Sequence, residues 1–178
     1  MLRSSSLPLH ACRALLALGV FASGITGAKA ERTKGVLTPT TDGQHLTTVL
    51  GAGVTGTVSA LGFSIMDSAS ANTVDLRVIG SGRTDGHLDP WVPGYTQLAG
   101  DEAYVPGTHM ATHYVADANG LRQNFIVFAA PEGQGSLCVE MGVSSRTTPT
   151  LIGTDHLRFV RPDGHLLFDY RDLHCWDA

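Results

Sequence analysis

The chain has 178 residues, of which 12 are basic and 16 acidic, and its formal net charge is −4. This length suffices for one domain with a buried core and requires no second domain. Its lysines and arginines form no cluster, which argues against a nucleic-acid partner, because concentrated positive charge is what holds a phosphate backbone.

Residues 1–30 have the pattern of a secretory signal peptide. Arg3 and Arg13 precede an apolar run over residues 14–22, and residues 28–30 read Ala-Lys-Ala, an A-x-A cleavage pattern. The apolar run is shorter than the roughly 20 residues of a membrane-spanning helix, so we expect no span after cleavage. The mature protein is expected to be secreted, either extracellular or in the cell envelope, in the periplasm or at the outer surface.

The mature chain would cover residues 31–178 and carry nine basic and 16 acidic side chains. Residues 31–43 are polar and rich in threonine, which predicts a loosely held N-terminal segment. A single domain is expected over residues 44–178.

Gly51, Gly53 and Gly56 have the spacing G-x-G-x-x-G directly after an apolar run. In a dinucleotide site this spacing joins a strand to a helix whose N-terminus receives the pyrophosphate. Residues 54–63 are instead rich in glycine and β-branched residues, and each glycine costs about 1 kcal/mol in a helix relative to alanine. They alternate like a strand, so we expect two strands joined by a glycine turn, and no bound nucleotide.

Turn signals in the rest of the chain separate short runs of β-branched and aromatic residues. Hairpin turns are expected at Asn119-Gly120 and at Pro162-Asp163-Gly164. The expected strands are residues 74–79, 113–115, 121–128, 137–143, 157–160 and 166–170. No ten residues of the mature chain keep a helical period, which predicts an all-β domain, an antiparallel β-sandwich or strongly curved sheet built from hairpins.

Cys12 is lost with the signal peptide, which leaves Cys138 and Cys175 in an oxidising compartment. The two can form a disulfide, or they can be separate thiols that pack as small apolar residues. The sequence leaves both alternatives open.

The residue patterns of common catalytic and metal sites are incomplete in this chain. On a strand, His109 and His113 lie roughly 13 Å apart, which is too far to share one metal ion. No G-x-S-x-G elbow supports a serine nucleophile. Histidines and aspartates gather between residues 163 and 174, but strand alternation turns most of them toward solvent. We therefore expect no catalytic residue, no metal and no cofactor.

Two stretches of the second half carry a resemblance to a known kind of module. They are NGLRQNFIVFAAPEGQGSLCVEMGVSS, which starts at residue 119, and LRFVRPDGHLLFDYRDLHCWDA, which runs to residue 178. They resemble the N-terminal β-rich module of large secreted bacterial repeat or adhesin-like proteins, often type IX secretion substrates with β-propeller or FG-GAP-like repeats downstream. The resemblance implies downstream repeat domains, other cell-surface proteins or glycans as partners. It also raises the alternative that the chain is a shortened module rather than a whole protein.

The residues that carry the resemblance are expected to be structural. They are Arg122, Gln123, Asn124, Phe125, Tyr170, Asp172, Leu173, Trp176 and Asp177. For Arg122, two alternatives stay open, a partly buried ion pair with Asp172 or Asp177, and a solvated position on its strand.

These observations predict a non-enzymatic secreted or cell-surface β module that serves in folding, spacing or recognition. The alternative is a secreted hydrolase or a carbohydrate-binding domain, in which Trp91 and Tyr95 of a Pro/Gly-rich loop stack against a sugar. Trp91 could equally fill part of the core.

Overall fold

The structure is a computed structural model that describes residues 14–21, 35–51, 53–145, 147 and 149–177. Strands make up 64% of the described residues, they pair antiparallel, and the described residues contain no helix. The predicted antiparallel all-β class is therefore confirmed. Nothing within these ranges is a helix with the length and apolar character needed to cross a membrane.

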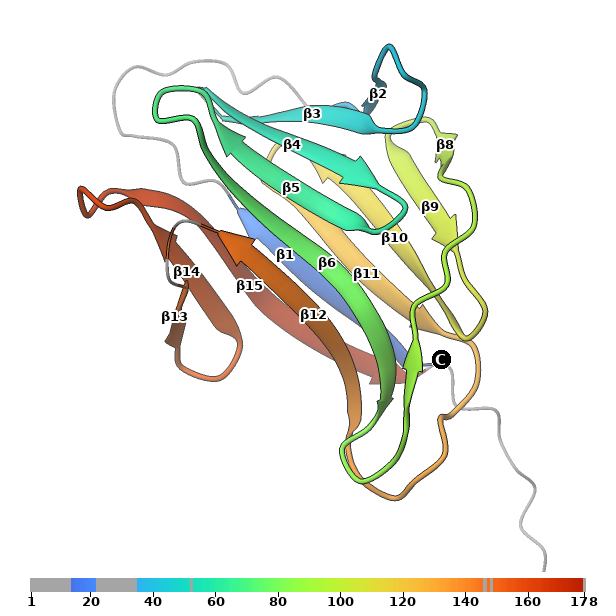
Figure 1. The fold of residues 1–178 in the computed structure, drawn as a ribbon. Helices are drawn as coiled ribbons and strands as arrows, with labels where there is room; N and C mark the ends of the chain where they lie inside the picture. The colour runs from blue at the N-terminus through green and yellow to red at the C-terminus, as the bar shows by residue number, and fades with distance from the viewer. Residues whose placement is uncertain (1–13, 22–34, 52, 146, 148, 178) are drawn as a thin grey trace, which may run out of the picture.

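The strands form two sheets (Figure 1). One contains β1 (Ala14–Phe21), β8 (Gln97–Ala99), β9 (Glu102–Pro106), β10 (Met110–Asp117), β11 (Gly120–Val127), β13 (Pro149–Ile152), β14 (His156–Val160) and β15 (Leu166–Asp177). The other contains β2 (Thr38–Pro39), β3 (Leu46–Gly51), β4 (Val54–Ser59), β5 (Gly62–Asp67), β6 (Asn72–Arg83), β7 (Leu88–Pro90) and β12 (Leu137–Ser145).

The order of strands sets which segments are neighbours. The eight-stranded sheet runs β13-β14-β15-β1-β11-β10-β9-β8, and the seven-stranded sheet runs β12-β6-β5-β4-β3-β2, with β7 paired to β6. After β1 in the eight-stranded sheet, the chain forms β2 to β7 of the seven-stranded sheet, crosses back for β8 to β11, returns once for β12, and ends with β13 to β15 in the eight-stranded sheet. Strands distant in sequence therefore become partners, as β6 and β12 do.

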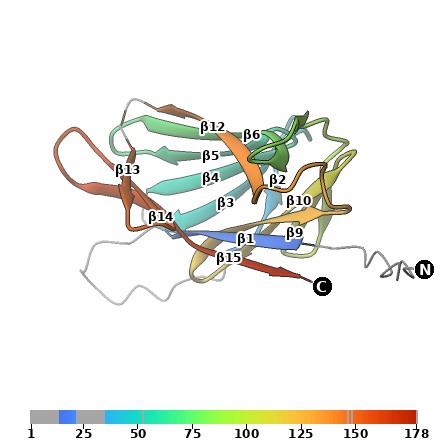
Figure 2. The same cartoon turned by 90° about the horizontal axis from the view of Figure 1, so that it is seen from below.

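The two sheets lie one above the other in Figure 2. Buried side chains of both sheets form a shared core. The ring of Phe63 in β5 lies with its centroid 6.3 Å from that of Tyr114 and 6.0 Å from that of Tyr170, both on the opposite sheet. Strand alternation produces this arrangement. Val54 and Val58 of β4 are buried, whereas the alternate positions, Thr55, Thr57 and Ser59, are only partly buried. Burial of each large apolar side chain contributes about 1.5–3 kcal/mol.

Both predicted hairpins are confirmed. β10 and β11 are joined through Ala118 and Asn119, whose backbone N–H donates to the Asp117 Oδ1 atom at 2.6 Å. β14 and β15 are joined through residues 161–165, where Gly164 has a φ of 86°. In the first turn the positive φ lies at Gly120, at 141°, and not at Asn119.

The glycine-rich stretch forms three strands rather than two. Gly53 forms the turn between β3 and β4 with a φ of 75°, and Gly62 opens β5 with a φ of 147°. Gly56 lies within β4, so no helix N-terminus follows the glycine spacing, and the context that a dinucleotide turn needs is missing from this part of the described chain.

The start of the described domain is attached to the core. Leu37 is only 2% exposed and belongs to the core, and Thr38 and Pro39 pair with β3. Residues 35–39 are therefore held against the domain, whereas residues 41–43 are exposed. The predicted strand at 74–79 is also longer than expected and extends over all of β6.

The apolar run of the predicted signal peptide is a strand in this structure. β1 lies between β11 and β15 and pairs antiparallel with both. Cleavage of the signal peptide concerns the secreted form of the protein and stays a prediction.

Alanine substitutions at Gly53, in the β3–β4 turn, and at Gly62, at the start of β5, test the close backbone approach at Gly62. At Gly62 a Cβ atom would lie 2.1 Å from the Leu76 carbonyl oxygen, whereas at Gly53 nothing lies within 4 Å. We expect Gly53→Ala to cost about 1–2 kcal/mol, which is the strain of the left-handed region alone. Gly62→Ala should cost at least twice as much, measured by urea unfolding. Equal losses would contradict the close approach to Leu76.

Candidate functional sites

A buried hydrogen-bonded bridge joins three strands of the eight-stranded sheet. The Gln123 side-chain amide donates to the Tyr114 hydroxyl at 2.9 Å, and the Tyr170 hydroxyl donates to the Gln123 Oε1 atom at 2.9 Å. Gln123 and Tyr114 are fully buried, and Tyr170 is 4% exposed. The Tyr170 hydroxyl also lies 3.5 Å from the Met141 sulfur of the opposite sheet. We call Tyr114, Gln123 and Tyr170 the Gln123 bridge.

The Gln123 bridge is a structural device. Burial raises the pKa of both tyrosines above the ordinary value of 10.0, so both hydroxyls stay protonated as hydrogen-bond donors. No solvent reaches the amide between them. Two of the residues that carry the sequence resemblance, Gln123 and Tyr170, are thus brought together from 47 positions apart.

A second polar group, Glu102, His113 and Asn124, lies on the outer face of the same sheet. The His113 Nε2 atom lies 3.0 Å from the Glu102 carboxylate, and the Asn124 amide nitrogen lies 3.1 Å from the His113 Nδ1 atom. Donation from the amide leaves Nδ1 as the acceptor, and the Nε2–H then donates to the carboxylate. Both ring nitrogens are engaged, so this histidine has no free nitrogen with which to accept a proton from a substrate.

Asp169, one of the aspartates between residues 163 and 174, contacts an arginine and a histidine of β14. Asp169 is 3% exposed, and the Arg158 Nε atom donates to its Oδ1 atom at 3.0 Å. The His156 Nε2 atom lies 2.8 Å from the same oxygen, in an ion-pair contact that is not aligned as a hydrogen bond. Burial alone raises the pKa of Asp169, but the contacts with Arg158 and His156 outweigh it and leave the pKa below its ordinary value.

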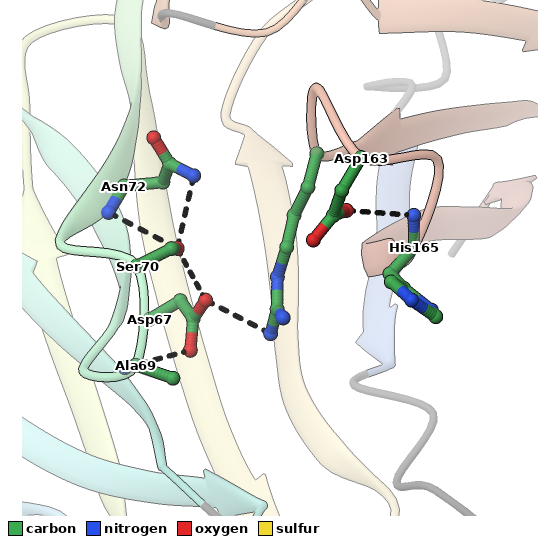
Figure 3. A network of polar contacts seen from close by, with 7 residues as sticks. Asp67, Ala69, Ser70, Asn72, Asp163 and His165 are labelled. Atoms are coloured by element: carbon green, nitrogen blue, oxygen red, sulfur yellow. Dashed lines mark hydrogen bonds and ion pairs between the residues drawn. The ribbon is translucent and has the colours of Figure 1, made fainter.

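A further carboxylate ties the two sheets together at one end of the molecule (Figure 3). Asp67, at the end of β5, is 1% exposed and lies 2.8 Å from the Arg161 guanidinium of the β14–β15 turn. The Ser70 hydroxyl also donates to it, and the Ala69 N–H donates at 3.2 Å. The bond from Ser70 is the main reason that the pKa of Asp67 is lowered, burial opposes it, and Arg161 adds to the lowering.

The remaining residues of the resemblance lie on β11 and β15. Phe125 is 2% exposed and packs in the core, whereas Arg122 is exposed and Asp172 lies 3.6 Å from Arg171 instead. Arg122 thus lies at an exposed position on its strand, as in the second of its two alternatives. Asp172 has a φ of 64°, at an irregularity in the pairing of β15 with β1. The side chains of Leu173, Trp176 and Asp177 lie outside the described part of the structure.

The structure favours the second alternative for the two cysteines, that of separate thiols. Cys138 is a free, partly buried thiol that pairs with Gly82 in the seven-stranded sheet. Cys175 lies on β15 of the other sheet, where it pairs with Leu16. Packed sheets are separated by about 10 Å, which exceeds the roughly 7 Å that a bridge can span between Cα atoms.

The two aromatic residues of the loop expected to stack against sugars, Trp91 and Tyr95, have different surroundings. The Trp91 indole N–H donates to the Ala60 carbonyl at 2.9 Å, and its ring packs against both core clusters and over Gly107. Trp91 therefore fills the core. Tyr95 is 88% exposed, and Val92 beside it is 58% exposed, so only Tyr95 remains open to a ligand.

The outer face of the seven-stranded sheet carries a row of hydroxyl groups that the sequence reasoning missed. Directly paired residues share a face, and the pairs run from Thr47 through Thr57, Ser64 and Asp75 to Ser144. We call this surface the hydroxyl face. The alternation of threonine and serine in residues 55–64 was the available signal, but it identifies a face only once the strand partners are known.

A shallow open depression lies at the β6–β12 end of the hydroxyl face. Its lining residues are Asp75, Arg77, Ile79, Gly142, Val143 and Ser144. Gly142 forms the floor, because a Cβ atom there would lie 3.3 Å from the Ile79 Cδ1 atom. A carboxylate, a guanidinium and a hydroxyl thus surround a small apolar patch, which suits the polar edge and apolar face of a sugar or a polar peptide.

Comparison with known proteins identifies no relative: no family model, no curated protein and no solved structure matches the chain. The resemblance of residues 119–178 to a secreted bacterial module therefore stays a prediction. Within the described ranges, no three His, Cys, Asp or Glu side chains converge as metal ligands.

The Gln123 bridge predicts a specific loss of stability. Gln123→Leu keeps the side-chain volume but leaves two buried hydroxyls without their amide partner, so unfolding should become easier by about 2–4 kcal/mol. Arg122→Ala, one residue away and exposed, should change stability by less than about 0.5 kcal/mol. Chemical denaturation of both variants makes the comparison, and a stable Gln123→Leu protein would show that the bridge is dispensable.

Asp67 predicts a pH dependence. Its pKa in the folded protein lies below the ordinary value of 3.8, so the unfolded chain binds protons more readily as pH falls. The stabilisation is complete above the unfolded pKa and is lost as pH drops through the folded one. We expect Asp67→Asn to lose about 3 kcal/mol at pH 7 by leaving Arg161 without its buried partner.

The matched measurement is the free energy of unfolding against pH for both proteins. The curve of Asp67→Asn should fall less steeply below pH 4 than that of the parent chain. Parallel curves would mean that Asp67 does not contribute to the acid sensitivity.

Proposed function

We propose that this protein is a non-enzymatic, secreted β-sandwich module of a cell-surface protein, and that it recognises a glycan through the hydroxyl face. The observation that carries the proposal is the depression at the end of that face. There Asp75, Arg77 and Ser144 stand on two directly paired strands, and among the described residues neither charge is used in an ion pair.

The positions of these groups support recognition rather than turnover. Side chains on the middle of paired strands keep their spacing, which lowers the ordering cost of binding. Sugar hydroxyls are met by carboxylates, guanidinium groups and hydroxyls in this kind of arrangement. The acidic and histidine side chains that could act in catalysis form contacts within the protein. Asp67 accepts a hydrogen bond from Ser70, His113 contacts Glu102, and Asp169 accepts one from Arg158.

The secreted location rests on the sequence of residues 1–30. The A-x-A pattern predicts that the exported protein begins at Glu31. Intact mass measurement of the exported protein tests this directly, and a retained Met1 segment would refute it.

A second candidate site for a glycan is the loop of Tyr95. The Tyr95 ring is exposed to solvent and could stack on a sugar, and the exposed Val92 side chain extends this apolar surface. The hydrolase alternative has no comparable support from any described cluster.

Glycan binding distinguishes the two surfaces. If the hydroxyl face binds, Arg77→Ala should weaken the best glycan on an array by about tenfold, the size of a hydrogen bond to a charged group. Tyr95→Ala and Arg122→Ala should then bind like the parent chain. Loss of binding only in Tyr95→Ala would move the site to the loop, and no glycan binding by any protein would refute recognition of this class.

Trp91→Ala serves a different purpose in that experiment. Because the indole packs in the core and bonds to Ala60, its removal should cost about 3–5 kcal/mol of stability and abolish binding through unfolding. Circular dichroism on each variant separates this effect from a loss of contact with the ligand.

A further inference from the structure

β1 occupies a gap of one strand between β11 and β15. Leu16, Leu18 and Val20 pair with Phe125, Gln123 and Leu121 of β11, respectively. Toward β15, Val20 pairs with Tyr170 and Leu16 with Cys175. Since β1 is antiparallel to both, β11 and β15 run parallel to each other, two strand spacings or roughly 9.5 Å apart.

The width of this gap is held by side chains that do not belong to β1. The Tyr170 hydroxyl reaches the Gln123 amide at 2.9 Å from the far side of the gap, in the buried layer between the sheets. On their outer sides β11 is paired with β10, and β15 is paired with β14. Direct pairing of β11 with β15 would require this bridge to rearrange.

The strand in the gap is the part of the chain that a secreted protein is expected to lose. β1 coincides with the apolar run of the predicted signal peptide, so this inference rests on the secretion proposed above. Its loss would leave backbone N–H and C=O groups unpaired on two strands and would uncover Leu121 and Phe125. The packed residues 35–39 cannot refill the gap, because Leu37 is buried in the core and Thr38 and Pro39 pair with β3.

The residues around Gly19 favour a negatively charged side chain at that position of the strand in the gap. Gly19 pairs with Arg122 on one side and with Arg171 on the other. Arg122 is exposed, and the Arg171 side chain is 41% exposed. A carboxylate at the position of Gly19 would therefore stand between two guanidinium groups on the outer face of the sheet, of which Arg171 already lies 3.6 Å from Asp172.

We propose that the gap between β11 and β15 is an acceptor site for a strand of another polypeptide in the secreted protein. The donor is an extended segment of about eight residues, antiparallel to both neighbours. It is apolar at the positions of Leu16, Leu18 and Val20 and acidic at the position of Gly19. Main-chain hydrogen bonds to two strands supply affinity, and the arginines select the register.

The test starts from the full chain, with a specific protease site inserted within residues 23–27. After cleavage, fluorescent peptides of residues 13–22 are offered as competing strands, each with a polar C-terminal tag. We expect the labelled peptide to exchange into the cut protein and to co-elute with it in gel filtration. A peptide with Leu16→Asp and Leu18→Asp should not enter.

The charge preference uses two further peptides that differ only at Gly19. The Gly19→Glu peptide should bind about threefold more tightly than the parent peptide, the size of an exposed ion pair, and Gly19→Lys more weakly. The difference should disappear at 1 M salt, where the Debye length is about 3 Å. In Arg122→Ala protein, the preference for Glu over Lys should shrink while the parent peptide still binds.

Three outcomes overturn the proposal. One is loss of the N-terminal fragment after cleavage, with the circular dichroism unchanged and no peptide bound, which means that the gap closes. Another is equal binding of the Glu and Lys peptides. The third is an exported protein that retains residues 1–30, because β1 then keeps its place. That mass measurement is independent of glycan binding, so a failure of the acceptor site and a failure of recognition at the hydroxyl face are read separately.

Discussion

The buried amide of Gln123 is the constraint around which the eight-stranded sheet is organised. A primary amide in an apolar core destabilises the fold unless its donor and acceptor both find partners. Tyr114 supplies one and Tyr170 the other, from strands on opposite sides of β11. The requirement fixes the register of three strands at once, and the contact of Tyr170 with Met141 extends it to the second sheet. Phe63 then packs against both tyrosine rings, so the polar bridge and the apolar core share the same side chains.

Buried ion pairs hold strands and turns together at one end of the molecule. The pair of Asp67 with Arg161 joins the β5–β6 turn to the β14–β15 turn, and the contacts of Asp169 with Arg158 and His156 clamp β14 to β15. These carboxylates are buried and therefore depend on their partners, which makes the end of the molecule where the turns meet sensitive to acid. The hydroxyl face has no such buried ion pairs among its described residues, because its side chains are exposed or partly exposed and its strands pack on the core through their inner side.

Local structure was predictable from the sequence, and the pairing of distant strands was not. Asn119-Gly120 and Pro162-Asp163-Gly164 predict their hairpins because positive φ and fixed proline geometry act within a few residues. The role of Gln123 could not be read in this way, since its partners lie 9 and 47 positions away. The same reason explains why the sequence left two alternatives open at Arg122 and at Cys138, whose surroundings are set by strand order. Leu37 shows that one apolar residue in a polar segment is enough to anchor it.

The position of β1 has a consequence for the order in which the chain acquires its structure. Ala14 pairs with Asp177, a separation of 163 positions, and β11 is more than 100 positions away. Contacts of such high sequence separation form late, because the whole chain must be made and the intervening loop closed first. While synthesis proceeds, the N-terminal apolar run has no partner strand within the protein. These eight residues are therefore made long before their neighbours in the sheet, and they take their place as a strand only at the end of folding.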